Sequence, residues 1–403
     1  MHLMEVVIEN YNSSHQYYIP LTYTVQKELA FNDSTPYYSI QKRKTYLMNK
    51  ILTNHDWVIF NIQQIGYYRV NYDLKNWKKI AHYLATVNYT QIHVLNRAQI
   101  IDDAFHFMIT KQLESATFWK ITEYLKHELN FVAWYPMFKA LEYMSSVFPL
   151  SEIISQRMQN ILHKVYEELP HKKMKKDDDT RKRLKQEVAK WACFFDDQKC
   201  KEIAKHNLIR SLREAEEFKL LPWWREWTYC NGLKISSYPD IINDKNSTWW
   251  EAYHVGKENF KSQILEYLAC FEHPDFITDY LNLIGNNNET SIMSLKDFSV
   301  QDRINCFLST IAKYARKNIV LNFIINKFME IKLNYFNFYR EINKAVIFTV
   351  LLNHLYSEDQ LEKVKEFTIS NLTKLQSISI KRLEENLDKP LEEILKVNLK
   401  YNY

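Results

Sequence analysis

Apolar and polar residues follow a period of two in the first part of the chain. Tyr68, Val70 and Tyr72 alternate with polar neighbours, which is the pattern of a half-buried strand. Gly66 is predicted to form a tight turn between this strand and the apolar segment before it. Further segments rich in β-branched and aromatic residues are separated by turn-forming clusters, and they predict strands at 5–8, 16–25 and 44–48. Residues 1–75 are therefore predicted to form a small β-sandwich domain.

From Asn76 onward, apolar residues recur at three- and four-residue steps, the period of an amphipathic helix. Asn76 is predicted to cap a helix over 77–87, and a single apolar stripe runs from Ile92 to Met108. More helices are expected at 116–129, 131–148, 151–169, 180–194 and 198–215, with less regular patterns continuing to residue 395. Short loops between such helices are typical of antiparallel helix pairs, which stack into an α-solenoid of the HEAT or armadillo kind. The predicted fold is mainly α, with a superhelical bowl over 76–403.

Composition agrees with a globular and mainly helical protein. The chain has 403 residues, of which 46% are hydrophobic and only four are glycine. So few glycines argue against a large β-protein and against a glycine-rich phosphate loop. The net charge is only +5, and the basic run 172–183 is interrupted by aspartates and contains no aromatic residue. We interpret it as a solvated loop, with Asp179 or Thr180 capping the next helix, and expect no nucleic-acid partner.

Targeting signals and sequons bear on the compartment. No segment reaches the roughly 18 apolar residues of a membrane span, the first residues do not have the pattern of a signal peptide, and the last ones lack an anchor signal. Six N-x-Ser/Thr sequons are glycosylation candidates: Asn12, Asn32, Asn88, Asn246, Asn288 and Asn371. A secreted pattern without a leader leads us to expect a chain separated from an N-terminal half.

The stretches 57–73, 96–105 and 124–134 carry three motifs that resemble the aminopeptidase N family of zinc metallopeptidases (gluzincin aminopeptidases). The stretch 57–73 is similar to that family's junction between β-sandwich and helical C-terminal domain. The stretch 96–105 resembles its R-A-Q-L-I-D-D-A-F helix, and 124–134 resembles Y-L-x-x-E-T-D-Y-V-P-W, with Asn130 in place of the acid and Ala133 in place of the proline. The motif residues, which we expect to be structural, are Gly66, Tyr67, Tyr68, Arg69, Asn71, Tyr72, Asp73, Arg97, Asp102, Asp103 and Trp134.

The resemblance also implies two disulfides, Cys193–Cys200 and Cys230–Cys270. In one continuous helix the Cα atoms of Cys193 and Cys200 would be about 10 Å apart, whereas a disulfide needs less than about 7 Å. The helix must therefore end between them, with Asp196 or Asp197 capping the next one. The alternative is four buried, reduced cysteines. Cys306 is left without a partner and is expected in the core.

Neither the family's H-E-x-x-H zinc motif nor its G-x-M-E-N motif is present in this chain. The closest approach to the zinc motif starts at His127, but Phe131 stands where the second histidine is required. We therefore expect no catalytic or metal-binding residue and no cofactor here, since the family's zinc would belong to a catalytic domain outside the chain. The resemblance implies that residues 76–403 shape and cap that domain's peptide cleft.

Other readings stay open. The chain could be a free-standing pseudo-enzyme or helical-repeat module that binds peptides or a protein partner, or an unrelated helical scaffold. Its expected partners are peptides or the catalytic domain, and a homodimer through the helical domain is a further possibility. Trp223-Trp224 and Trp249-Trp250 could line a peptide groove, although buried core is the usual place for such doublets. Disulfides, sequons and resemblance together predict an extracellular or cell-surface location.

Overall fold

The computed structural model divides into two compact units, which we describe separately. The first unit is Met1–Tyr143 with Gln156–Val188, and the second is Met144–Ser155 with Ala189–Tyr403. The predicted domain boundary at residue 75 stays a prediction. The structure describes residues 4–6, 19–36, 38–40, 46–48, 56–147, 150–169, 178–234, 247–260, 262–285, 297–327, 346–347, 350–351, 353–355 and 357–371.

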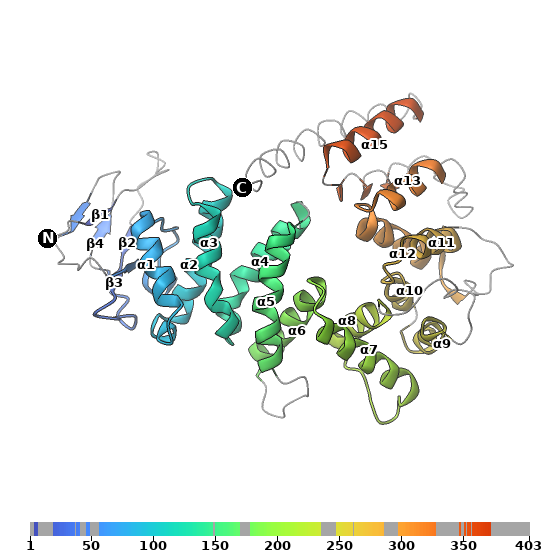
Figure 1. Cartoon of the computed structure of the whole chain (residues 1–403), viewed down its shortest axis with the longest axis horizontal. Helices are drawn as coiled ribbons and strands as arrows, with labels where there is room; N and C mark the ends of the chain where they lie inside the picture. Colours follow the sequence, from blue (N-terminus) through green and yellow to red (C-terminus); the bar gives the residue numbers. More distant parts are fainter. Residues whose placement is uncertain are drawn as a thin grey trace. The chain divides into compact units, whose positions relative to one another are not determined.

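The described strands form three antiparallel pairs near the start of the chain (Figure 1). They are β1 (Met4–Val6) with β5 (Tyr46–Met48), β2 (Ile19–Leu21) with β4 (Tyr38–Ile40), and β3 (Tyr23–Val25) with β6 (Val58–Phe60). All residues of β3 and β6 are buried, and Val70 and Tyr72 pack against them. The strand predicted over 68–72 is wrong, because these residues pair with no strand and reach the core through side chains alone.

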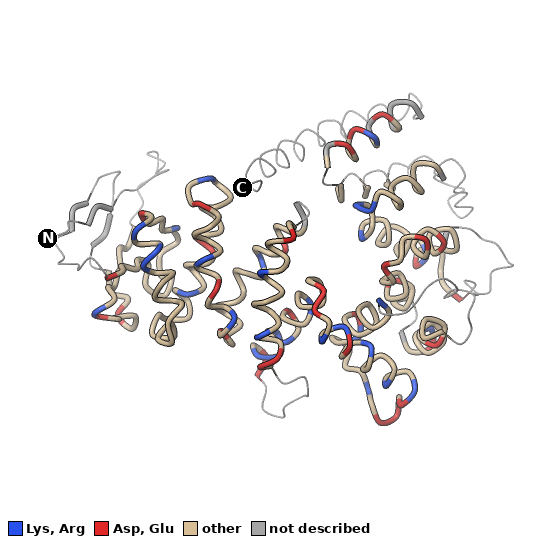
Figure 2. The backbone as a smooth tube through the Cα atoms, viewed as in Figure 1, with Lys and Arg blue, Asp and Glu red and all other residues tan. Residues whose placement is uncertain are grey.

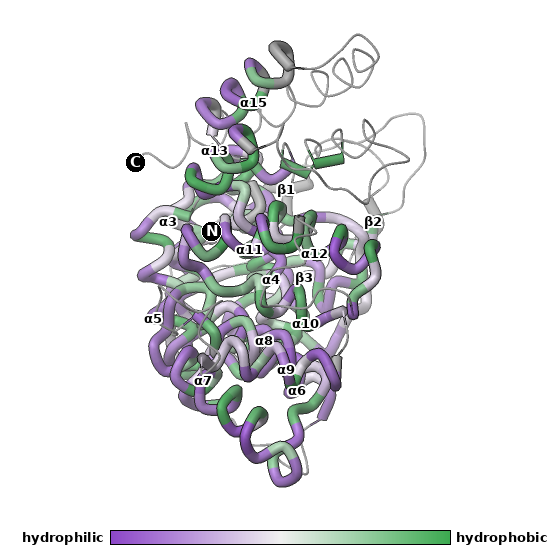
Figure 3. The backbone as a smooth tube through the Cα atoms, turned by 90° about the vertical axis from the view of Figure 1, so that its right-hand side faces the viewer, coloured by the Kyte–Doolittle hydropathy of each residue, from purple (hydrophilic) through white to green (hydrophobic). Residues whose placement is uncertain are grey.

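The rest of the described chain is mainly helical, as the sequence predicts. The first unit holds η1 (Ile62–Gln64), α1 (Leu74–Leu84), η2 (Tyr89–Gln91), α2 (Val94–Ile109), α3 (Ser115–Thr122) and η3 (Glu123–His127). Three helices contribute to both units: α4 (Phe131–Val147), α5 (Glu152–Glu168) and α6 (Asp179–Phe194). Hydrophobic and hydrophilic residues alternate along helices such as α5 and α7 (Gln198–Arg213), as expected of helices buried on one face (Figure 3).

The second unit has one large core. Its further helices are α8 (Pro222–Leu233), α9 (Thr248–Phe260), α10 (Gln263–Leu268), α11 (Pro274–Gly285), α12 (Val300–Tyr314), α13 (Asn318–Lys327) and α15 (Glu358–Asn371). One cluster of buried apolar side chains runs from Leu208 to Val364. Trp249 and Trp250 belong to it, as expected of core residues, whereas Trp223 is 52% exposed. Cys306 is also buried there without a disulfide partner.

Helix α1 begins earlier than the sequence predicts. The carboxylate of Asp73 accepts hydrogen bonds from the backbone N–H groups of Lys75 and Asn76, at 2.8 and 3.0 Å, so Asp73 is the N-cap. The prediction that Asn76 caps this helix is therefore wrong. Asn76 lies inside the helix and is buried, which frees its side chain for another role.

The caps of α6 and α7 test two further predictions. Asp178 accepts the backbone N–H three residues on at 2.7 Å, so the prediction of Asp179 or Thr180 as cap falls one or two residues late. The side chain of Asp197 accepts the N–H three residues on at 2.8 Å, which selects Asp197 from the two predicted caps of α7.

Lysine, arginine and acidic residues are interspersed along these and the other described helices (Figure 2).

Candidate functional site

We define the junction as residues 56–134, which connect the strands to the first helices. Asn61 follows β6 with a left-handed φ of 57°. Its side chain accepts from the N–H of Gly66 at 2.8 Å and donates to the carbonyl of Gly66 at 2.9 Å. The intervening loop is thereby closed by one amide side chain.

Gly66 has a different role from the one its sequence context indicates. Its φ is not positive, and no strand follows it, so it is not the turn glycine of a strand pair. A Cβ at Gly66 would instead overlap the ring of Tyr68. The hydroxyl of Tyr68 donates to the carbonyl of Pro20 at 2.9 Å. Gly66 therefore leaves the space through which Tyr68 reaches strand β2.

Two buried asparagines attach the helices to strand β6 and to the loop that follows it. In α1, Asn76 accepts from the N–H of Val58 at 3.0 Å and donates to its carbonyl at 2.8 Å. In α2, Asn96 accepts from the N–H of Gln63 at 2.9 Å and donates to the carbonyl of Asn61 at 3.0 Å. Sequence reasoning gave Asn76 the role of a helix cap and did not single out Asn96. The available signal was an amide at positions that the helical period places on the buried face.

An ion-pair cluster connects the extended segment after Gly66 to α2. Arg69 Nη1 lies 2.6 Å from Asp102 Oδ2 and 3.0 Å from Asp103 Oδ1. Asp103 also accepts from the N–H of Val70 at 3.0 Å. Burial raises the pKa of Asp103 to about 6, against the lowering effect of the Val70 N–H and of Arg69. Three predicted motif residues, Arg69, Asp102 and Asp103, are thus brought together.

The other motif residues of this segment lie around an aromatic cluster of Phe60, Tyr72 and Trp77. Tyr72 Oη accepts from the N–H of Phe60 at 3.0 Å, and its ring lies edge-on to that of Trp77, 4.9 Å away. The indole N–H of Trp77 donates to Asn71 Oδ1 at 3.0 Å. Tyr67 is the exception, because its side chain is fully exposed.

A second, fully buried ion pair lies at the other end of α2. Arg97 Nε donates to Glu128 Oε2 at 2.8 Å, with both side chains almost inaccessible to solvent. Arg97 also donates to the carbonyl of Ile92 at 2.5 Å. Trp134 Nε1 donates to the backbone carbonyl of Glu128 at 2.8 Å. The pair therefore holds the turn between η3 and α4 against the start of α2.

Zinc does not fit the one segment that approaches its motif. His127 ends η3 and Phe131 begins α4, so the two positions do not share one helical face. The carboxylate of Glu128 between them is engaged by Arg97. Within the described part of the chain, no group of three His, Cys, Asp or Glu side chains could hold a metal ion. The hydrogen bonds and ion pairs of the junction connect segments of the chain to one another, which is a structural role.

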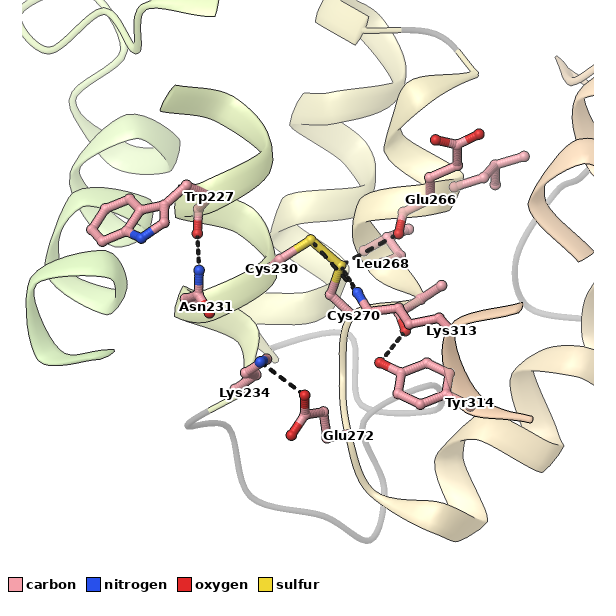
Figure 4. Close-up of a disulfide and its surroundings, with 12 residues drawn as sticks. Trp227, Cys230, Asn231, Lys234, Glu266, Leu268, Cys270, Glu272, Lys313 and Tyr314 are labelled. Atoms are coloured by element: carbon pink, nitrogen blue, oxygen red, sulfur yellow. Dashed lines mark hydrogen bonds and ion pairs between the residues drawn. A yellow bond between two sulfur atoms is a disulfide. The ribbon is translucent and has the colours of Figure 1, made fainter. Parts of the chain in front are cut away.

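Both implied disulfides are present in the second unit. Cys193 and Cys200 have Cα atoms 5.4 Å apart, because Asp196 adopts a φ of 69° and breaks the helix as expected. Cys230 at the end of α8 and Cys270 after α10 have Cα atoms 4.7 Å apart, and Lys313 from α12 lies against this second bond (Figure 4).

Two further predictions concern the surface. Of the six sequon asparagines, Asn32 and Asn88 are exposed, whereas the other side chains lie outside the described residues. In the described residues no helix combines the length and apolar character needed to cross a membrane.

The sequence that builds this mainly helical fold and its junction matches a C-terminal domain of aminopeptidase N-like proteins. The model of the ERAP1-like C-terminal domain family matches residues 57–389, so the chain belongs to that family. Aminopeptidase N of Plutella xylostella is 24% identical over 380 residues, which are 92% of this chain and 38% of that protein. The membrane alanyl aminopeptidase of Heliothis virescens is 26% identical over 68% of this chain and 27% of its own length. The thyrotropin-releasing hormone-degrading ectoenzyme of Rattus norvegicus is 28% identical over 68% of this chain and 26% of its own length. The chain thus spans well under half of each relative.

Proposed function

We propose that this chain shapes and caps the peptide-binding cleft of an aminopeptidase N-like zinc peptidase whose catalytic domain lies outside it. Family membership and the partial coverage of the aminopeptidase relatives support this proposal. In this proposal the strands form a small β-sandwich and the helices an α-solenoid that walls the cleft. The zinc, which would supply the activated water for peptide hydrolysis, would be held by the other domain.

The observation that carries the proposal is a set of exposed apolar side chains within the junction. Large apolar residues are usually buried, and a concentration of exposed ones marks an interaction surface. Within 65–87, four such side chains face solvent: Ile65, Tyr67, Leu74 and Val87. Val87 is 91% exposed and Tyr67 fully so. A catalytic domain packed on this stretch would cover them.

The location we propose is extracellular or at the cell surface. The two disulfides are typical of an oxidising compartment. Asn32 and Asn88 lie in sequons and are exposed, so both could accept a glycan. Two relatives carry the words membrane and ectoenzyme in their names.

Association in trans tests the proposal. The chain is mixed with the catalytic part of Plutella xylostella aminopeptidase N, and binding is measured by calorimetry. We expect binding that is weakened at least tenfold, by about 1.4 kcal/mol or more, when Tyr67→Ser and Val87→Ser are combined. Ile153→Ser is the matched control, because Ile153 on α5 is also strongly exposed but lies outside 65–87. Equal weakening by the control, or no binding at all, contradicts the proposal.

A second candidate is a free-standing module that binds peptides through its helices, and the exposure of Trp223 at the start of α8 favours it. Titration of the isolated chain with peptides, followed by tryptophan fluorescence, separates the two functions. Micromolar peptide binding that Trp223→Ala abolishes supports the module. The genomic sequence upstream of Met1 provides an independent test, because an in-frame H-E-x-x-H segment there supports the peptidase.

A further inference from the structure

A buried lysine lies against one of the two disulfides. Lys313 Nζ is 2.7 Å from Cys270 Sγ and 4.0 Å from Cys230 Sγ (Figure 4). A cation beside a cysteine sulfur stabilises its thiolate form. We propose that Cys230–Cys270 is a thiol–disulfide exchange site, in which a small external thiol attacks Cys230 and Lys313 stabilises the departing Cys270 thiolate.

The two sulfurs of this bond differ in access. Cys270 is only 2% exposed, whereas Cys230 at the end of α8 is partly exposed. An incoming thiolate must approach a sulfur from outside, and the rate rises when the leaving thiol has a low pKa. Access therefore favours attack at Cys230, and the lysine favours departure of Cys270. Both asymmetries select the same direction of exchange.

The surroundings keep Lys313 in place and charged. Its neighbour Tyr314 donates to the carbonyl of Ala269 at 2.8 Å, which fixes α12 against the residue before Cys270. Glu272, an acidic group that acts on Lys313, is paired with Lys234 at 2.8 Å. Burial lowers the pKa of Lys313 to about 8, and Lys234 adds to this effect while Glu272 and Glu226 oppose it. Most of the amine is still protonated at pH 7.

The exchange has two balanced steps. The external thiolate forms a bond to Cys230 Sγ, the Cys230–Cys270 bond breaks, and its electron pair stays on Cys270 Sγ as a thiolate next to the Lys313 ammonium. A second external thiolate then attacks the external sulfur of the mixed disulfide and releases Cys230 as a thiolate. Two thiols are oxidised to one disulfide, and the protein disulfide is reduced by two electrons.

The other disulfide is an internal reference. Cys193 and Cys200 are both buried, at 2% and 0% exposure. Cys200 Sγ lies 3.2 Å from the carbonyl oxygen of Ala189. That oxygen would repel a thiolate at Cys200, where Lys313 attracts one at Cys270. Cys193–Cys200 should therefore open more slowly than Cys230–Cys270 in the same molecule.

Regiochemistry in the unmodified chain is the first test. The full chain is treated with reduced glutathione, quenched with iodoacetamide and mapped by peptide mass spectrometry. We expect glutathione on Cys230, the alkyl group on Cys270 and an intact Cys193–Cys200. Glutathione on Cys270, earlier opening of Cys193–Cys200, or no opening at millimolar glutathione overturns the proposal.

Variants of Lys313 are the second test. If the lysine lowers the pKa of the leaving thiol by roughly two units, a dependence of about half a log unit per pKa unit gives a tenfold faster opening. Lys313→Met should therefore slow opening about tenfold, and Lys313→Arg should keep most of the rate. Lys317→Met is the control, because Lys317 lies in the loop between α12 and α13 and donates to the carbonyl of Glu272. An unchanged rate in Lys313→Met, or equal changes at both disulfides, contradicts the role of the lysine.

Discussion

The junction and the core of the second unit are stabilised by different kinds of contact. In the junction, buried polar groups meet specific partners, as Asn96 meets the backbone of Asn61 and Gln63. In the core, aromatic rings pack against one another: the ring centroid of Phe276 lies 5.8 Å from that of Trp249 and 5.6 Å from that of Tyr280. A hydrogen-bonded pair requires particular atoms, whereas a packed ring requires volume. The two regions should therefore respond differently to substitution.

The largest effect is expected at the buried ion pair of the junction. Arg97→Met leaves the Glu128 carboxylate buried without its cation, and breaking such a pair costs about 3–5 kcal/mol. The midpoint of urea unfolding, with hydrogen exchange in α2 and α4, measures this loss. A change below about 1 kcal/mol contradicts the importance of the pair.

A paired variant is the control for this prediction. Arg97→Met combined with Glu128→Gln removes both charges, and it should recover much of the loss because no buried charge is left alone. Equal losses in the single and the double variant would show that Arg97 acts through packing or through its bond to the carbonyl of Ile92.

The disulfides of the second unit provide the next comparison. Cross-linking stabilises by restricting the unfolded chain, so the effect increases with loop length. The sequence separations are 40 residues for Cys230–Cys270 and 7 for Cys193–Cys200. Replacing both cysteines of a pair with serine should therefore cost about 4 kcal/mol for the first pair and about 2.5 kcal/mol for the second. Calorimetric melting of the two double variants shows which one loses more stability. A larger loss for the Cys193–Cys200 pair contradicts the dependence on loop length.

The pH dependence of the junction sharpens the comparison, because the junction contains the buried carboxyl group of Asp103. Asp103 has a pKa of about 6 in the folded chain against an ordinary value of 3.8. The folded state therefore binds more protons between these values, and stability from this group is full below pH 4 and lost as the pH rises through 6. The loss amounts to about 3 kcal/mol at most.

Urea unfolding between pH 4 and 7 tests the sign. Relative to Asp103→Asn, the unmodified chain should lose stability as the pH rises through this window. The pKa of His106 nearby is lowered by burial and by Arg69 and raised by Asp102, all of which both proteins retain, so the difference between the two proteins reports Asp103. A constant difference, or one of the opposite sign, would contradict the raised pKa.

The contrast between the junction and the core also explains which parts of the structure could be predicted from the sequence. The motif around Arg69 and Asp103 is recognisable because their geometry tolerates few other residues, and the residues indeed form one cluster. The helix predicted over 131–148 is observed over Phe131–Val147, and the predicted disulfide pairing is confirmed. The extended segment 68–72 is misread as a strand because its side chains alternate in burial without a backbone partner. Period two reports which side chains are buried, and it does not show where the backbone hydrogen bonds go.

The smallest effect is expected for a substitution of similar shape in the aromatic core. Phe276 is fully buried, and Phe276→Leu keeps an apolar side chain that fills most of the space of the ring. The loss in the free energy of unfolding should therefore stay below about 1.5 kcal/mol. Asn96→Leu is the matched change in the junction. It leaves the N–H of Gln63 and the carbonyl of Asn61 without their partner, and each unsatisfied buried group costs about 1–3 kcal/mol. Urea unfolding of both variants measures the two losses in the free energy of unfolding. Equal costs would mean that the junction tolerates substitution as the core does, and that the recognisability of its motif has another cause than its hydrogen-bond geometry.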